Sequence, residues 1–177
     1  MISKGAGVKS RTWLTGILVL LQILFLCGIA FSYYAVSWFG HEIKLKTVPV
    51  DPRDFLYGDY VTLSYEISRL KPGIWQEQGK LPEEGEPVYV LLKPVNGLYE
   101  AQAAYRSSPD VKPGEAVLKG VVQYSWDEAI TVKYGLEKYY VPEGTGKALE
   151  EQAGNMIVRV KVASWGQAKI ESLEPQS

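Results

Sequence analysis

Residues 58–65 read Gly58-Asp59-Tyr60-Val61-Thr62-Leu63-Ser64-Tyr65, and Glu66 and Ile67 follow them. From Val61 to Ile67 every second residue is apolar or aromatic, which is the period of a strand with one face in a core. Gly58 permits a tight turn before this strand, and Asp59 can hydrogen-bond the backbone there. The stretch therefore predicts a turn and then a strand that directs Leu63 and Tyr65 inward and Tyr60 to the opposite face.

Short strands and turns recur through the rest of the chain. Val88–Leu92 and Leu98–Tyr105 flank Asn96-Gly97, a strong signal for a type I′ hairpin, and Pro94 argues that the first strand is an edge or is interrupted there. Arg69–Pro87 reads as a long loop that carries Ile74 and Trp75. Lys147–Gln152 could form one or two helical turns. Further strands are predicted at Ala116–Tyr124, Ile130–Val141 (broken near Gly135), Asn155–Ala163 and Gln167–Leu173.

The segment His41–Val50 is a short stalk or a first strand, in which Ile43, Leu45 and Val48 mark the alternation. The chain then has about seven or eight strands with one short helix. This composition predicts a mainly β fold, either an all-β sandwich or a partly open barrel.

An apolar segment precedes the β-domain. No charged residue lies between Thr12 and Gly40, and a helix of that length exceeds the roughly 30 Å hydrocarbon core of a bilayer. Lys4, Lys9 and Arg11 precede the segment, so the positive-inside rule places the N-terminus in the cytoplasm. The sequence therefore predicts a cytoplasmic N-terminus at residues 1–12, a single transmembrane helix at residues 13–39 and an extracytoplasmic β-domain at residues 41–177.

A cleaved signal peptide is the alternative for this segment. Ala30-Phe31-Ser32 and Ala35-Val36-Ser37 both offer small residues at the spacing of a cleavage site. The apolar run is longer than the usual core of a signal peptide, which favours an uncleaved anchor.

Composition excludes several classes of function for the outer domain. All 20 acidic residues and all but three of the 19 basic residues follow Gly40, so no basic face for nucleic acid or anionic lipid is expected. The sole cysteine, Cys27, lies in the apolar segment, and His41 is the sole histidine. These counts argue against disulfides, histidine-based triads and His-rich zinc sites in that domain. We therefore expect no metal, no cofactor and no catalytic constellation, and a protein that is not an enzyme.

The motif at residues 58–65 resembles the signature of the GDYXXLXY family, since Gly58, Asp59, Tyr60, Leu63 and Tyr65 meet every specified position. The lead-in Asp51-Pro52-Arg53-Asp54 and the stretch 139–147 are similar to further blocks of that family. The resemblance implies a bacterial protein anchored in the cytoplasmic (inner) membrane. The family has no established activity, and its members are commonly encoded beside multi-pass membrane proteins.

Two interpretations of the motif remain open. In the structural one, Gly58 and Asp59 form the turn, and the charged lead-in braces it. In the functional one, a polar recognition surface is formed by Asp51, Arg53, Asp54, Asp59 and Tyr60. An N-terminal anchor before Gly58-Asp59-x-Val61 also resembles type I signal peptidases. Their serine lies eight residues before that glycine, where this chain has Val50, so the Ser-Lys dyad cannot be assembled.

The sequence thus predicts a membrane-anchored accessory protein that partners a multi-pass membrane protein. The alternative is a cell-envelope module that binds peptide or glycan through the Arg69–Pro87 loop and Trp75, with Trp126 and Trp165 as further surface aromatics. A carboxylate-based hydrolase that uses Glu143 and Glu150 is the third and least favoured hypothesis.

Overall fold

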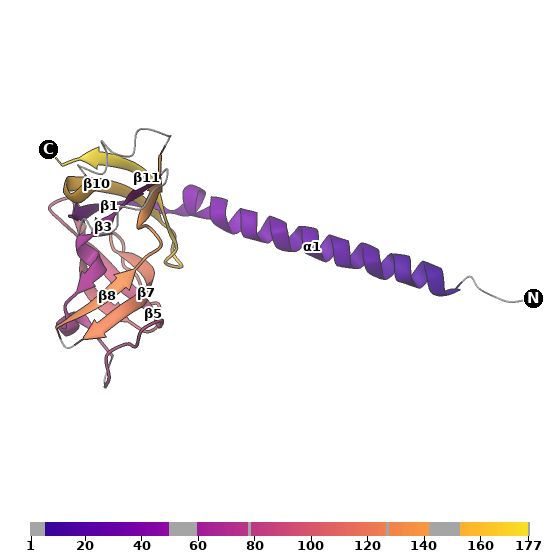
Figure 1. Ribbon diagram of the computed structural model, residues 1–177, viewed down its shortest axis with the longest axis horizontal. Helices are drawn as coiled ribbons and strands as arrows, with labels where there is room; N and C mark the ends of the chain where they lie inside the picture. The colour runs from indigo at the N-terminus through magenta and orange to yellow at the C-terminus, as the bar shows by residue number, and fades with distance from the viewer. Residues whose placement is uncertain (1–5, 50–59, 78, 127, 142–152, 177) are drawn as a thin grey trace, which may run out of the picture.

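A long N-terminal helix precedes a β-domain in the computed structural model, which describes residues 6–49, 60–77, 79–126, 128–141 and 153–176 (Figure 1). The helix is α1 (Ala6–Phe39), and the described residues after it include the short 3-10 helices η2 (Glu66–Ser68), η3 (Pro72–Ile74) and η4 (Ala153–Asn155). The strands are β1 (His41–Val48), β2 (Tyr60–Thr62), β3 (Ser64–Tyr65), β4 (Arg69–Leu70), β5 (Pro87–Val95), β6 (Leu98–Tyr105), β7 (Ala116–Trp126), β8 (Ala129–Lys133), β9 (Lys138–Tyr140), β10 (Met156–Val162) and β11 (Ala168–Pro175).

Three antiparallel sheets make up the described part of this domain. One has the order β11-β10-β1-β3, another β4-β8-β7-β5-β6, and β2 pairs with β9 alone. The five-stranded sheet curls into a half-barrel around the core, which confirms the mainly β prediction. Among the described residues, seven strands are five residues or longer, and the others are short pieces of two or three. The helix predicted at Lys147–Gln152 lies outside the described residues.

In β1 and β10, every second side chain points inward, and these side chains are the contribution of the four-stranded sheet to the core. Ile43 and Leu45 point inward as predicted, and every second residue of β10 from Met156 to Val162 is buried. The prediction for Val48 was wrong, because the next inward position after Leu45 is Thr47. Its hydroxyl accepts from the Met156 amide at 2.8 Å and donates to the Met156 carbonyl at 3.0 Å, so a polar side chain is satisfied inside the core.

The predicted hairpin is present between β5 and β6. Asn96 and Gly97 have φ angles of 51° and 83°, the paired left-handed conformations of a type I′ turn. β5 is not an edge strand, since β7 pairs with it from Pro87 to Leu92. Pro94 lies beyond that pairing, so its missing amide leaves no hydrogen bond to β7 unmade.

The segment Arg69–Pro87 is more ordered than the predicted long loop. It contains β4 and η3, and Trp75 bridges Ala104 in β6 and packs against the core. The Arg106 guanidinium lies 5.6 Å from the centre of the Trp75 ring. Trp75 is therefore a packing residue, and the prediction that it forms an exposed binding element is not supported.

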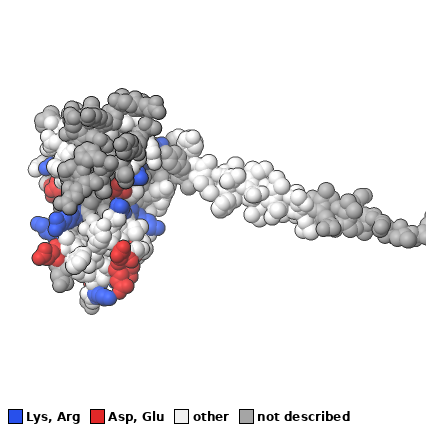
Figure 2. Space-filling view, in the orientation of Figure 1, with Lys and Arg blue, Asp and Glu red and all other residues white. Residues whose placement is uncertain are grey.

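Helix α1 carries apolar side chains on all its faces outside the β-domain. The part from Trp13 to Phe39 is long and apolar enough to cross a membrane, and Figure 2 shows no Lys, Arg, Asp or Glu on its described surface. Its length and composition suit a membrane anchor and also a signal sequence.

The last turns of α1 are part of the β-domain. Ala35 and Val36 are only 5% and 2% exposed, and the Lys161 ammonium donates to the Ser37 carbonyl at 3.1 Å. That contact satisfies one of the carbonyls left free at a helix C-terminus.

The connection between helix and domain is a single residue, Gly40. Its amide donates to the Val36 carbonyl at 2.9 Å, and β1 starts at the next residue. A Cβ at this position would overlap the Val36 oxygen and lie 3.2 Å from the Lys161 Cβ. Only glycine fits here without displacing the helix end, so α1 and the domain meet without a linker.

Candidate functional site: the motif strand and the surfaces beside it

The inward residues of the motif lock two distant parts of the chain together. Val61, Leu63, Tyr65 and Ile67 are all buried, as predicted. The Tyr65 hydroxyl donates to the Leu136 carbonyl at 2.7 Å, and the Leu63 amide donates to the Glu137 carbonyl at 2.9 Å. The motif is therefore pinned to the segment that connects β8 and β9.

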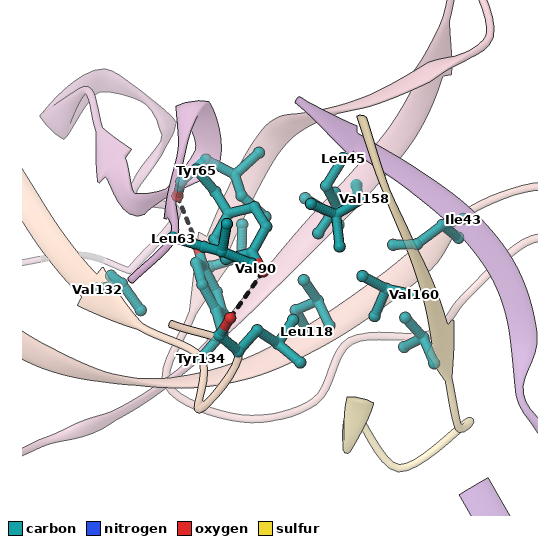
Figure 3. Close-up of a cluster of buried hydrophobic side chains, with 14 of the residues drawn as sticks. Ile43, Leu45, Leu63, Tyr65, Val90, Leu118, Val132, Tyr134, Val158 and Val160 are labelled. Atoms are coloured by element: carbon teal, nitrogen blue, oxygen red, sulfur yellow. Dashed lines mark hydrogen bonds between the residues drawn. The ribbon is translucent and has the colours of Figure 1, made fainter. Parts of the chain in front are cut away.

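A second tyrosine, Tyr134, makes the reciprocal hydrogen bond from the β8–β9 segment back to the motif. The Tyr134 hydroxyl donates to the Ile67 carbonyl at 2.7 Å, so Tyr65 and Tyr134 each bind the backbone beside the other (Figure 3). The Glu137 carboxylate accepts from the Tyr134 amide at 2.7 Å. We call this arrangement the tyrosine clamp; it comprises Tyr65, Tyr134 and their acceptors Leu136 and Ile67.

Burial keeps both hydroxyls of the clamp neutral. It raises the pKa of Tyr65 and of Tyr134 far above the usual value of about 10, and the nearby Glu137 carboxylate raises each pKa further. A phenol in this state donates a hydrogen bond and does not exchange protons near neutral pH. The Tyr65 hydroxyl therefore serves as a buried hydrogen-bond donor that holds the fold together.

Tyr60 lies on the other face, as predicted. β2 pairs with β9 so that Tyr60 is opposite Tyr140, and their rings meet edge to face with centroids 5.9 Å apart. The Lys138 ammonium lies 4.5 Å from the Tyr60 ring centre, within cation–π range. Tyr60 is half-buried under these two neighbours, of which Tyr140 is largely exposed.

The other members of the predicted recognition surface cannot be placed beside Tyr60. Asp51, Arg53, Asp54 and Asp59 lie outside the described residues, as does Gly58 of the motif. The recognition surface therefore remains a prediction, of which Tyr60 is the described part.

A cleft opens beside the motif strand, between the edges of the two larger sheets. It has a volume of about 830 Å³, within the usual range for ligand sites. Its wall includes side chains with hydrogen-bonding groups, among them Ser64, Glu66, Arg69, Tyr124, Trp126 and Glu128.

A β-bulge in β7 gives this cleft its aromatic wall. The pairing of β7 with β8 shifts between Val122 and Tyr124, and the extra residue reverses which face the following side chains occupy. Val122 is buried, whereas Tyr124 and Trp126 are 52% and 73% exposed. The two aromatic rings can stack on apolar faces of a ligand, and the neighbouring carboxylates and guanidinium can bind its polar groups.

The three tryptophans of the β-domain do not form one surface. Trp75 packs on the core, Trp126 lies in the cleft wall, and Trp165 lies in the β10–β11 turn. That turn contacts β7 at Lys119, whose amide donates to the Gly166 carbonyl. Sequence reasoning could not separate the three tryptophans, because the bulge that exposes Trp126 has no composition signal.

The carboxylates considered for hydrolysis, Glu143 and Glu150, lie outside the described residues, so the hydrolase hypothesis stays a prediction. Glu83 and Glu86 are held by ion pairs with Lys80 and Arg106 at 2.6 and 3.0 Å. Within the described part of the chain, no group of three His, Cys, Asp or Glu side chains is close enough to hold a metal ion.

Comparison with protein families identifies the chain. The model of the GDYXXLXY protein family matches residues 22–173. The chain belongs to this family. The match extends from the middle of α1 into β11, so it covers the clamp and both larger sheets of this GDYXXLXY protein. Searches of curated proteins and of solved structures gave no match.

Proposed function

We propose that this GDYXXLXY protein is a bacterial membrane-anchored binding subunit. Its β-domain lies outside the cytoplasmic membrane and associates there with a multi-pass membrane protein. It acts by binding and not as an enzyme. The observation that carries the proposal is the junction at Gly40, where the helix ends and the β-domain starts without a linker.

The junction argues against cleavage at the second candidate site, after Ser37. Cleavage after Ser37 would remove Ala35 and Val36, which are buried against the domain, and the carbonyl that Lys161 binds. The folded domain would then expose the apolar surface that these residues cover.

The junction also limits the reach of the domain. A module that searches the cell wall needs a stalk, whereas a domain fixed to the helix end contacts only what lies at the membrane surface. A membrane protein beside it meets both the apolar helix and the domain. This geometry supports an integral membrane partner over a distant one.

Site-specific photocrosslinking in intact cells tests the proposal. A photoreactive residue replaces Trp126 in the cleft wall or Leu24 on the exposed surface of α1. Exposed Val111, in the connection between β6 and β7, serves as the control position. We expect one multi-pass membrane protein to be captured from Trp126 and Leu24 and not from Val111. Capture of no membrane protein from either position would contradict the proposal.

The cleft supports a second candidate, an envelope module that binds glycan or peptide. Tyr124 and Trp126 offer stacking surfaces to sugar rings or side chains, with Glu66, Arg69 and Glu128 as hydrogen-bonding groups. Purification in mild detergent separates the two candidates. A stoichiometric membrane partner supports the first, whereas an isolated protein that binds wall fragments, and loses them on Trp126→Ala, supports the second.

A further inference from the structure

The β10–β11 turn, residues 163–167, lies on the side of the β-domain where α1 joins it. β1 and β10 are antiparallel, and His41, the first residue of β1, pairs with Val162 at the end of β10. The residues after Val162 therefore extend past the start of β1, towards the helix. Figure 1 shows this yellow turn on the side from which α1 leaves the domain. The register of the sheet thus places the tip of the turn beside the end of α1.

The turn also lies at the depth of the aromatic residues at the helix end. Gln167 of the turn lines a small pocket together with Val36 of α1. Tyr34 and Trp38 flank Val36 in sequence, and both are exposed. These two aromatic residues are separated by only about 6 Å along the helix axis. Aromatic residues at the end of a spanning helix mark the interfacial layer of a bilayer, so the turn reaches that layer beside the helix.

The turn is uncharged and presents an aromatic ring. Residues 162–168 contain no charged side chain, and Trp165 is 45% exposed. The Trp165 indole N–H donates to the side-chain oxygen of Gln167 at 3.1 Å. Because this donor is already satisfied, the ring can enter an apolar layer without carrying an unpaired polar group into it.

The turn is fixed to the sheet behind it. The Gly166 amide donates to the Ala163 carbonyl, and the Lys119 amide of β7 donates to the Gly166 carbonyl, both at 2.9 Å. Gly166 has a φ angle of 88°, and a Cβ there would lie 3.1 Å from the Lys119 nitrogen. A turn held in this way loses little conformational freedom when it meets a surface, and this preorganisation favours binding.

We propose that the β10–β11 turn is a second membrane contact, in which the Trp165 ring enters the interfacial layer of the bilayer that α1 crosses. The occupant of this surface is lipid and not a protein partner. Because α1 and the β-domain meet without a linker, the two contacts together fix the orientation of the domain on the membrane. The turn has no charge, so the contact does not require anionic lipid. The inference rests on the anchor in the proposed function and adds a lipid contact to it.

Quenching of tryptophan fluorescence by brominated lipid tests the inference. The full chain is reconstituted into vesicles of brominated phosphatidylcholine and, for reference, into vesicles of the same lipid without bromine. The starting protein carries Trp13→Phe and Trp38→Phe, which remove the tryptophans of α1. Bromine on the acyl chains quenches tryptophans that enter the bilayer, so any quenching of this protein comes from the β-domain.

Trp165→Phe and Trp126→Phe are the matched variants of the starting protein. Trp126 is more exposed than Trp165, at 73%, but it lines the cleft together with Val48, at the other end of β1 from α1. We expect bromine to quench the starting protein and its Trp126→Phe variant. Trp165→Phe should abolish most of this quenching. Circular dichroism confirms that each variant is folded.

The Trp126→Phe variant tests the inference even if Trp165→Phe does not fold. Its remaining tryptophans are Trp165 and Trp75, and Trp75 packs on the core. Absence of quenching in this variant, or equal quenching after Trp165→Phe, would overturn the lipid contact. Quenching that appears only after phosphatidylglycerol is added would also overturn it, because the contact would then be electrostatic. In intact cells, capture of a protein by a photoreactive residue in place of Trp165 would overturn it in favour of a protein occupant.

A separate measurement tests the anchor. Membranes from cells that make the wild type are washed with alkaline carbonate, which releases proteins that lack a spanning segment. Release of the chain would contradict the proposed function itself. A chain that stays in the membrane while Trp165 is not quenched contradicts only the turn contact.

Discussion

At the residue scale, the motif is best understood through the tyrosine clamp. Tyr65 and Tyr134 lie far apart in sequence, and each donates to a carbonyl beside the other. Because these carbonyls are buried, a missing donor leaves an acceptor that water cannot reach. The two hydroxyls are thus expected to contribute to stability, and the motif should be intolerant of change at Tyr65 for that reason.

Removal of either hydroxyl should destabilise the domain. Tyr65→Phe and Tyr134→Phe each leave one buried carbonyl unpaired and should lower the free energy of unfolding by about 1–3 kcal/mol. Tyr140→Phe is the control, since Tyr140 is 73% exposed. Urea unfolding followed by tryptophan fluorescence measures the three variants. Clamp variants as stable as the control would show that these hydrogen bonds contribute nothing.

The clamp should also make the protein sensitive to alkaline pH. Burial raises the pKa of both tyrosines in the folded state, whereas an unfolded tyrosine titrates at about 10. Below pH 10 the stabilisation is fully present. Above it the unfolded chain releases protons that the folded chain retains, so stability falls by about 1.4 kcal/mol per pH unit for each tyrosine. We measure the free energy of unfolding from about pH 8 to about pH 11. It should fall less steeply with pH in the Tyr65→Phe, Tyr134→Phe double variant than in the wild type.

The sequence predicts one half of the clamp and not the other. The inward direction of Leu63 and Tyr65 follows from a period of two. Their acceptors at Leu136 and Glu137 follow only from the long-range packing of the segment between β8 and β9. Thr47 illustrates the same limit, because its burial depends on hydrogen bonds to Met156 in β10. Local patterns specify which face a residue occupies, and tertiary contacts specify its partner.

At the scale of elements, some predictions follow from local sequence alone. Asn96-Gly97 predicts the hairpin between β5 and β6, and the long run without charged residues predicts α1. The motif strand was predicted as continuous but is divided into β2, β3 and η2, because its two ends join different sheets. The cleft could not be predicted at all, since the bulge before Tyr124 depends on how β7 pairs with β8.

The junction between α1 and β1 should be intolerant of any side chain at residue 40. Gly40→Ala forces a Cβ against the Val36 carbonyl and the Lys161 side chain, and such overpacking costs about 1–3 kcal/mol. Gly73→Ala is the matched control, because a Cβ there meets no atom within 4 Å. Thermal unfolding of the full chain in detergent should show a lower midpoint for Gly40→Ala alone. Equal midpoints in the two variants would mean that the helix end is not packed as described.

At the scale of the whole molecule, function should depend on surfaces that folding does not need. Tyr60→Ala and Trp126→Ala change a half-buried and an exposed aromatic, so both proteins should reach wild-type levels in cells. A deletion strain that carries either variant should nevertheless lose the function that the wild type restores. Immunoblots measure the protein level beside the complementation assay. Loss of protein in both variants would assign these residues to stability.

The pairing of β1 with β10 has a consequence for how the protein is made. His41 is the first residue of β1 after α1, yet its partner is Val162, near the other end of the sequence. The four-stranded sheet therefore cannot close until almost all of its strands have been synthesised. Contacts so far apart in sequence fold slowly, so the β-domain stays open through most of its synthesis. The last strands to be synthesised complete the sheet that begins at the end of α1.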